Sequence, residues 1–158
     1  MTSANLRVIG LGSPFGDDAV GLLAIEALER RPQFAGRVQF HALDRPGTLL
    51  IPLLQASAHV IVIDAVHSGA PPGTLQFLSL DHVRGGMHGH APSSHGLGLA
   101  QALTLAEAIG ALPQRLEVWG IEMGALPGPE RSELSLALAL ALPDVTARIE
   151  ARLTNLLA

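Results

Sequence analysis

The stretch Val60-Ile61-Val62-Ile63-Asp64 is apolar at four consecutive positions and then ends in a carboxylate. A strand with one wet face alternates apolar and polar residues, whereas a strand covered on both faces is apolar throughout. These residues therefore predict a central parallel strand, which we place at His59–Asp64. A carboxylate at the end of such a strand lies in the crevice where open α/β sheets bind ligands. It can also serve as a turn or capping carboxylate, so the residues alone leave its role open.

Short β-branched runs alternate with longer Ala- and Leu-rich segments on both sides of this strand. This alternation is typical of an α/β fold with a mainly parallel sheet. The link at residues 67–73 is too short for a helical crossover, so we expect the strand after it to run antiparallel. The length predicts a single domain over residues 1–158.

The same patterning locates the remaining elements. Asp81–Gly98 is rich in Gly, His and Ser without a period, and is predicted to be a long surface loop. We place the other strands at Arg7–Gly10, Val38–Leu43, Thr74–Ser79 and Leu116–Gly120, and the helices at Asp18–Arg30, Gly47–Gln55, Gly96–Ile109 and Arg131–Leu156.

The composition excludes several kinds of chemistry. Of the 158 residues, 48% are hydrophobic and only 15% are charged, which excludes an intrinsically disordered chain. There is no Cys, which removes thiol nucleophiles, disulfides and Cys-ligated metal centres. All 10 basic residues are Arg, so Schiff-base and P-loop chemistry, which need a Lys, are excluded. The net charge of −4 and the absence of Tyr argue against nucleic-acid binding.

No stretch indicates export or membrane insertion. The segment before Leu6 is short and polar, and no signal-peptide cleavage site follows it. The longest apolar run, Leu134–Leu142, is about half as long as a membrane span. We therefore expect a cytoplasmic protein that binds neither nucleic acid nor a membrane.

The loop after the first strand combines glycines with two adjacent carboxylates. Gly10, Gly12 and Gly16 have the spacing G-x-G-x-x-x-G, which differs from the dinucleotide-binding fingerprint. Asp17 and Asp18 would also oppose a phosphate at the start of the next helix. One of the two carboxylates could cap this helix. That interpretation leaves the other carboxylate without a structural reason.

His95 directly precedes the predicted helix that begins at Gly96. It is either a solvated residue at the start of that helix or a functional group at the same sheet edge as Asp18 and Asp64. Two carboxylates and one imidazole form an O,O,N ligand set that suits a borderline first-row divalent ion. His88 and His90 are weaker candidates in the same loop. The hydrolase signatures G-x-S-x-G and H-E-x-x-H are absent from the sequence.

A series of short motifs runs along nearly the whole chain. In order they are Gly10-x-Gly12, Asp17-Asp18-x-x-Gly21, Ile63-Asp64-Ala65, Pro72-Gly73-Thr74, Ser94-His95-x-x-Gly98-Leu99, Gly110-x-Leu112-Pro113, Gly120-Ile121-Glu122, and Leu134-Ser135 with Leu142-Pro143. Each motif is weak alone, but the ordered set is fairly specific. It resembles the hydrogenase maturation endopeptidases.

This resemblance implies a fold, a reaction and a set of residues. The fold is a three-layer α/β/α sandwich with a five-stranded, mostly parallel sheet that contains one antiparallel strand. The reaction removes a C-terminal extension from the large subunit of nickel–iron hydrogenase after nickel insertion. The family's two metal-contacting acids fall on Asp18 and Asp64, and its loop histidine falls on His95. The nickel is carried by the precursor, so the resting enzyme need hold no metal.

The prediction is thus a nickel-dependent endopeptidase, of the aspartic or metallo type, in which Asp18, Asp64 and His95 are catalytic and contact the metal. Its partner is the hydrogenase large-subunit precursor. One alternative is a chaperone that senses nickel in the same precursor without cleaving it, because the segment Asp44–Thr48 is shorter than in the family. Another is a small-molecule hydrolase, which rests on fold analogy alone. The sequence identifies no nucleophile and leaves open whether Asp17 or Asp18 faces the metal.

Overall fold

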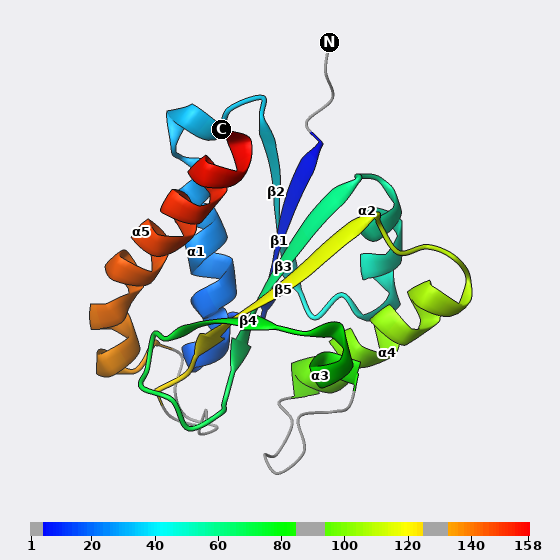
Figure 1. Ribbon diagram of the computed structural model, residues 1–158. Helices are drawn as coiled ribbons and strands as arrows, with labels where there is room; N and C mark the ends of the chain where they lie inside the picture. The colour runs from blue at the N-terminus through cyan, green and yellow to red at the C-terminus, as the bar shows by residue number, and fades with distance from the viewer. Residues whose placement is uncertain (1–4, 85–93, 125–132) are drawn as a thin grey trace.

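The computed structural model describes residues 5–84, 94–124 and 133–158, apart from the side chains of Arg84 and of residues 94–97. Within these residues, five strands form one sheet in the order β2-β1-β3-β5-β4 (Figure 1). Four of the strands are parallel, and β4 runs antiparallel to β5. Their bounds are β1 (Leu6–Gly12), β2 (Val38–Asp44), β3 (His59–Val66), β4 (Leu75–Leu78) and β5 (Arg115–Glu122).

Helices cover both faces of the sheet, which confirms the predicted three-layer α/β/α sandwich (Figure 1). One face is covered by α1 (Val20–Glu29) and α5 (Leu136–Leu157), and the other by α2 (Ile51–Gln55), α3 (Leu80–Arg84) and α4 (Ser94–Ala108). Three short 3₁₀ helices are η1 (Gly16–Ala19), η2 (Pro32–Phe34) and η3 (Gly47–Leu50). No helix among the residues described is long and apolar enough to cross a membrane.

The central strand β3 contributes to both hydrophobic cores. Ile61 and Ile63 pack in the core beneath α1 and α5, whereas Val60 and Val62 pack in the core beneath α2 and α4. All four side chains are completely buried. Since successive side chains of a strand point to opposite faces, a strand between two helical layers needs an apolar residue at every position. The apolar run therefore predicted the place of β3 in the sheet correctly.

Helix α1 packs unusually closely on β1, and glycines on both elements allow this approach. A Cβ built on Gly10 would lie 2.4 Å from a side-chain carbon of Ile25 and 2.6 Å from the carbonyl oxygen of Gly21. A Cβ on Gly21 would in turn lie 2.5 Å from the carbonyl oxygen of Leu11. These glycines therefore serve helix–strand packing, which gives the first loop a structural reason that needs no bound phosphate.

Two sequence-based expectations about the elements need correction. The expected loop at Asp81–Gly98 is wrong at both ends, because α3 occupies residues 80–84 and α4 already begins at Ser94. The last helix begins at Leu136, five residues later than expected at Arg131. The strand after the short link, β4, is antiparallel as predicted, and it pairs with β5 at the edge of the sheet.

Candidate functional site

The candidate site lies at the carboxyl edge of the sheet, between β1 and β3. After β1 the chain passes to β2 on one side, and after β3 it passes to β4 on the other side. Such a switch point leaves a crevice outside the carboxyl ends of the two neighbouring strands, and open α/β sheets bind ligands there. Asp18 follows β1, and Asp64 lies near the end of β3. The topology thus brings both predicted carboxylates to one crevice.

Asp64 is a nearly buried carboxylate with 5% of its surface exposed. One of its oxygens accepts a hydrogen bond from the backbone N–H of Ala65 at 2.8 Å. Alternation along β3 places the Asp64 side chain on the same sheet face as Val60 and Val62, which is the face covered by α4. The carboxylate therefore lies on the side of the sheet where the first turn of α4 begins.

Asp18 lies in η1, which folds back over the end of β1. Its carbonyl oxygen accepts a hydrogen bond from the backbone N–H of Ser13 at 3.4 Å, and the Ser13 hydroxyl lies 3.5 Å from its carboxylate. The negative charge of Asp18 also contributes to raising the pKa of Arg45, after the larger effects of the hydrogen bond and charge of Asp44. Asp18 is thus partly exposed at the crevice, near the loop that follows β2.

Asp17 has a different position and a different role. Its carboxylate is 3% exposed and accepts hydrogen bonds from Gly124 N at 2.9 Å, Ser135 N at 2.7 Å and Ser135 Oγ at 2.9 Å. Ser135 is itself the N-cap of α5. The expectation that Asp17 or Asp18 caps the following helix is wrong, since neither η1 nor α1, both fully described, has a side-chain cap. Asp17 instead fastens the first loop to the start of α5.

The structure locates the three histidines that the sequence singled out only in part. His95 lies in the first turn of α4, but its side chain is outside the described part of the structure, as are His88 and His90 altogether. Among the side chains that are described, no group of three or more His, Asp or Glu residues could hold a metal ion. The set of Asp18, Asp64 and His95 therefore stays a prediction, with its two carboxylates placed at one edge.

Glu122 is a buried carboxylate at the end of β5 to which the sequence analysis gave no role. It is completely buried and accepts hydrogen bonds from Ser68 N, Ser68 Oγ, Gly69 N and Gln76 Nε2 at 2.7–3.0 Å. These bonds hold the link between β3 and β4 beside the candidate site. Its sequence signal was the same as that of Asp64, an acid that ends an apolar strand.

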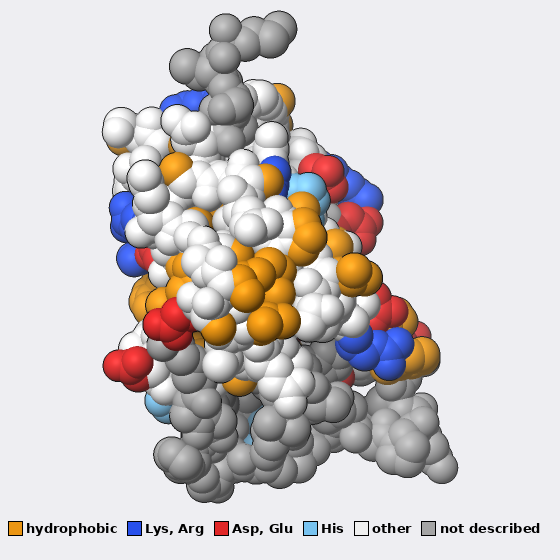
Figure 2. Space-filling model, turned by 90° about the vertical axis from the view of Figure 1, so that its right-hand side faces the viewer, with side chains coloured by type: hydrophobic (Ala, Val, Ile, Leu, Met, Phe, Trp, Pro, Cys, Tyr) orange, Lys and Arg blue, Asp and Glu red, His pale blue; other side chains and the backbone are white. Residues whose placement is uncertain are grey.

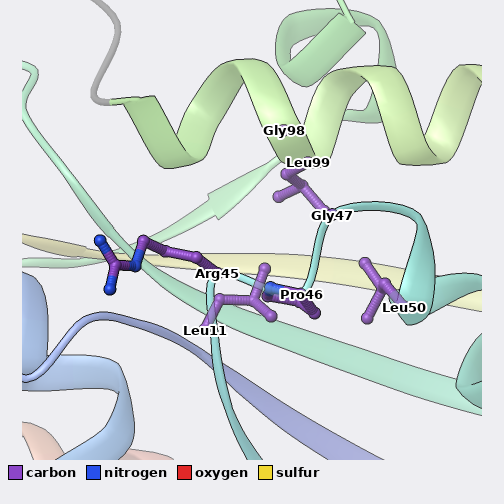
Figure 3. A pocket seen from close by; sticks show the side chains of 7 residues that line it. All are labelled: Leu11, Arg45, Pro46, Gly47, Leu50, Gly98 and Leu99. Atoms are coloured by element: carbon purple, nitrogen blue, oxygen red, sulfur yellow. The ribbon is translucent and has the colours of Figure 1, made fainter.

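The loop after β2 adds a small apolar pocket to this edge. Arg45 has a left-handed backbone with φ 45°, its N–H donates to Gly12 O at 3.0 Å, and its guanidinium pairs with Asp44 at 2.7 Å. The adjoining pocket has a volume of about 170 Å³ (Figure 3). It is lined by Leu11, Arg45, Pro46, Gly47, Leu50, Gly98 and Leu99. The role of Asp44 that is visible here is to hold Arg45 at the mouth of this pocket.

These features define the class of the molecule: a doubly wound α/β domain with two carboxylates and an apolar pocket at its topological switch point. Comparison with known proteins narrows the class. The family described as hydrogenase maturation protease has a model that matches residues 22–152. The chain belongs to this hydrogenase maturation protease family and is an endopeptidase of that type, as the resemblance predicted.

Individual relatives agree with this assignment. The hydrogenase expression/formation protein HoxM of Azotobacter vinelandii is 31% identical over 94% of this chain and 75% of its own length. The hydrogenase 2 maturation protease of Escherichia coli is 31% identical over 97% of this chain and 88% of its own length. The solved structure of a hydrogenase maturating endopeptidase from E. coli matches with a TM-score of 0.78 at 25% identity, covering 96% of this chain and 93% of that one.

Proposed function

We propose that this protein removes the C-terminal extension of a nickel–iron hydrogenase large-subunit precursor after nickel has been inserted into that precursor. The observation that supports this most is the convergence of Asp18 and Asp64 on the crevice between β1 and β3, in a chain of the hydrogenase maturation protease family. The expected cytoplasmic location is part of the same proposal. The nickel is part of the substrate, so a chain without Cys can take part in nickel-dependent cleavage.

In this proposal three side chains of the protein contact the nickel that the precursor carries. The carboxylates of Asp18 and Asp64 and the imidazole of His95 supply an O,O,N ligand set, which suits nickel(II). Carboxylates from two different elements hold the metal in a fixed direction relative to the sheet, so the peptide bond near it is held in a fixed direction too. The nickel contributes Lewis-acid chemistry, by polarising the scissile carbonyl or lowering the pKa of a water molecule.

The hydrogen bonds around these residues support a distinction between carboxylates that contact the metal and carboxylates that hold the backbone in place. Asp17 is committed to Gly124 and Ser135, so it fixes η1 and thereby the direction of the neighbouring Asp18. Glu122 fixes the link that leaves β3 just after Asp64. Two buried carboxylates thus hold η1, which carries Asp18, and the link that follows β3, the strand that carries Asp64. We assign Asp17 and Glu122 as positioning residues and not as catalytic residues.

The test replaces each carboxylate of the crevice by its amide. Asp18→Asn and Asp64→Asn remove a charge without changing the shape of the side chain, and each is expected to slow cleavage of the nickel-loaded precursor by roughly 100-fold or more. Asp144→Asn is the matched control, because Asp144 is an exposed residue of α5 that pairs only with Arg148 among the contacts found. Its cleavage rate should equal that of the wild type. The readout is the intact mass of the precursor over time.

Other results would redirect the proposal. Cleavage by Asp18→Asn and Asp64→Asn at the wild-type rate would remove both carboxylates from the reaction. A stable complex between the wild-type protein and the precursor without any loss of mass would instead favour the chaperone that senses nickel. Hydrolysis of a short ester or peptide without any precursor would favour the small-molecule hydrolase.

A further inference from the structure

Gly98 lies in the interior of α4, and no packing reason for a glycine there is found among the residues that the structure describes. A Cβ built on it would meet no atom within 4 Å among the residues described, its own helix backbone and chain neighbours aside. Its backbone φ is in the range that any residue adopts. Glycine destabilises a helix interior relative to alanine, so this position carries a cost that the fold itself does not require.

The open space beside Gly98 is the pocket at the carboxyl edge of β1. Leu11, Leu50 and Leu99 form its walls and are each at most 5% exposed, so the pocket is a hollow between fixed, buried side chains. Figure 3 shows Leu99 reaching from α4 toward the loop of Pro46 and Gly47. The absence of a side chain at Gly98 keeps this hollow open.

The size of the pocket limits what it can bind. Its volume of about 170 Å³ is below the ~300 Å³ at which small-molecule sites begin. It therefore fits a single side chain better than an entire organic ligand. Because its walls are leucines and a proline, that side chain gains most by being aliphatic.

The pocket lies next to the two carboxylates of the candidate site. Leu11 of β1 and Asp64 of β3 follow the paired residues Gly10 and Ile63, and strand alternation puts both on the face covered by α4. Neighbouring strands are ~4.8 Å apart and an extended peptide advances ~3.3 Å per residue. A peptide held at Asp64 therefore has a residue within about one or two positions that reaches this pocket.

Arg45 adds a charge at the mouth of the pocket. Figure 3 shows its guanidinium pointing away from Leu50 and Leu99. The guanidinium interacts with Asp44 and is close enough to Asp18 to be influenced by its charge. A lysine or arginine side chain in the pocket would bury its charge among apolar side chains without a partner, and this cost disfavours it.

We propose that this pocket is a specificity subsite, which takes one aliphatic side chain of the precursor within two residues of the bond that is cleaved. The inference rests on the proposed function. It goes further by assigning Leu11, Leu50, Gly98 and Leu99 to the selection of substrates, and by giving Gly98 the role of leaving room for the substrate side chain.

The test enlarges the side chain at position 98 of the enzyme and varies the size of the substrate side chains near the cleaved bond. The two residues on each side of the cleaved bond in a nickel-loaded precursor are changed singly to Ala, Leu, Phe and Arg, and kcat/KM is measured from product mass. For the wild-type enzyme, Leu should be preferred over Phe and Arg by about tenfold or more at one of the positions, and only there. Gly98→Leu should lower kcat/KM for that Leu-containing precursor by about tenfold or more, and Ala at the same precursor position should restore cleavage.

Two controls separate this effect from damage to the protein. Gln101→Leu adds the same side chain to an exposed position of α4 and should leave the entire substrate profile unchanged. The melting temperature of Gly98→Leu should be no lower than that of the wild type. Identical profiles for Gly98→Leu and wild type would overturn the subsite while leaving the proposed function intact. Failure of the wild-type enzyme to cleave any nickel-loaded precursor would overturn both.

Discussion

Asp17 and Asp18 are neighbours in the sequence, but they serve different parts of the molecule. Asp17 is buried and bound to the backbone of Gly124 and to Ser135, whereas Asp18 is partly exposed at the crevice. In the sequence, a single helix cap leaves one of the two carboxylates without a structural reason. The partners of Asp17 cannot be predicted from the sequence, because they lie 107 and 118 positions away in the chain and no local pattern indicates such a contact.

We predict that Asp17→Asn destabilises the protein. An amide presents one oxygen where the carboxylate presents two, and its N–H groups face donors from Gly124 and Ser135. A buried donor left without an acceptor costs about 1–3 kcal/mol, so the free energy of unfolding in urea should fall by that amount. Asp144→Asn should change it by less than about 0.5 kcal/mol. An Asp17→Asn protein as stable as the wild type would show that these bonds contribute nothing.

At the scale of elements, two glycines in helices serve opposite purposes: one allows close packing, and the other leaves a space unfilled. Gly21 of α1 faces the backbone of β1, and a Cβ there would lie 2.5 Å from the carbonyl oxygen of Leu11. A Cβ on Gly98 of α4 would meet no atom of the described residues within 4 Å. Both occur in motifs of the sequence, yet the sequence does not distinguish the glycine that allows close packing from the glycine that leaves a pocket open.

The same substitution should therefore have opposite effects at the two positions. Gly21→Ala should destabilise the protein by about 1–3 kcal/mol, because α1 must move away from β1. Gly98→Ala should stabilise it by up to about 1 kcal/mol, because alanine favours the helix and nothing described obstructs its Cβ. Thermal and urea unfolding of the two variants side by side measure this contrast. Destabilisation by Gly98→Ala would mean that the space beside it is already filled.

Element types were predicted well where the signal is local, and poorly where it is not. The run of β3 is short and rich in β-branched residues, whereas the segment of α4 is long and rich in Ala and Leu, and these local features indicate their types. Helix α3 is only five residues long, which is too short for a helical period to appear. The short link after β3 indicated the direction of β4 correctly. The pairing of β4 with β5 depends on the packing of the whole sheet, which the link itself does not show.

At the scale of the whole molecule, the sheet order brings the candidate site together. Strands β1 and β3 lie side by side in the sheet (Figure 1), so residues far apart in the sequence meet at the switch point between them. Buried carboxylates hold the adjoining loops. The sequence predicted which acids lie at strand ends, since parallel strands share one carboxyl edge. It could not predict the pocket, which requires the loop after β2 and helix α4 to pack against the same strand.

The side of the molecule formed by α2 and α4 is mainly apolar near its centre among the residues described. Figure 2 shows the side formed by α2 and α4, where hydrophobic side chains gather near the centre and charged ones lie toward the margins. Exposed apolar residues there include Leu49, Leu105 and Ile109. Exposed apolar residues are normal on protein surfaces, because more than half of the surface of a folded protein is apolar. Charge, burial and a shaped hollow occur together at the carboxyl edge of the sheet, and we therefore propose that the functional site lies there.

The most direct measurement of the central claim is the intact mass of a hydrogenase large-subunit precursor incubated with this protein, once loaded with nickel and once without nickel. The account predicts that a C-terminal fragment is lost only from the nickel-loaded precursor. Equal cleavage of both forms would contradict the proposal that Asp18, Asp64 and His95 contact the nickel of the substrate. Cleavage of neither form would contradict the proposed reaction itself.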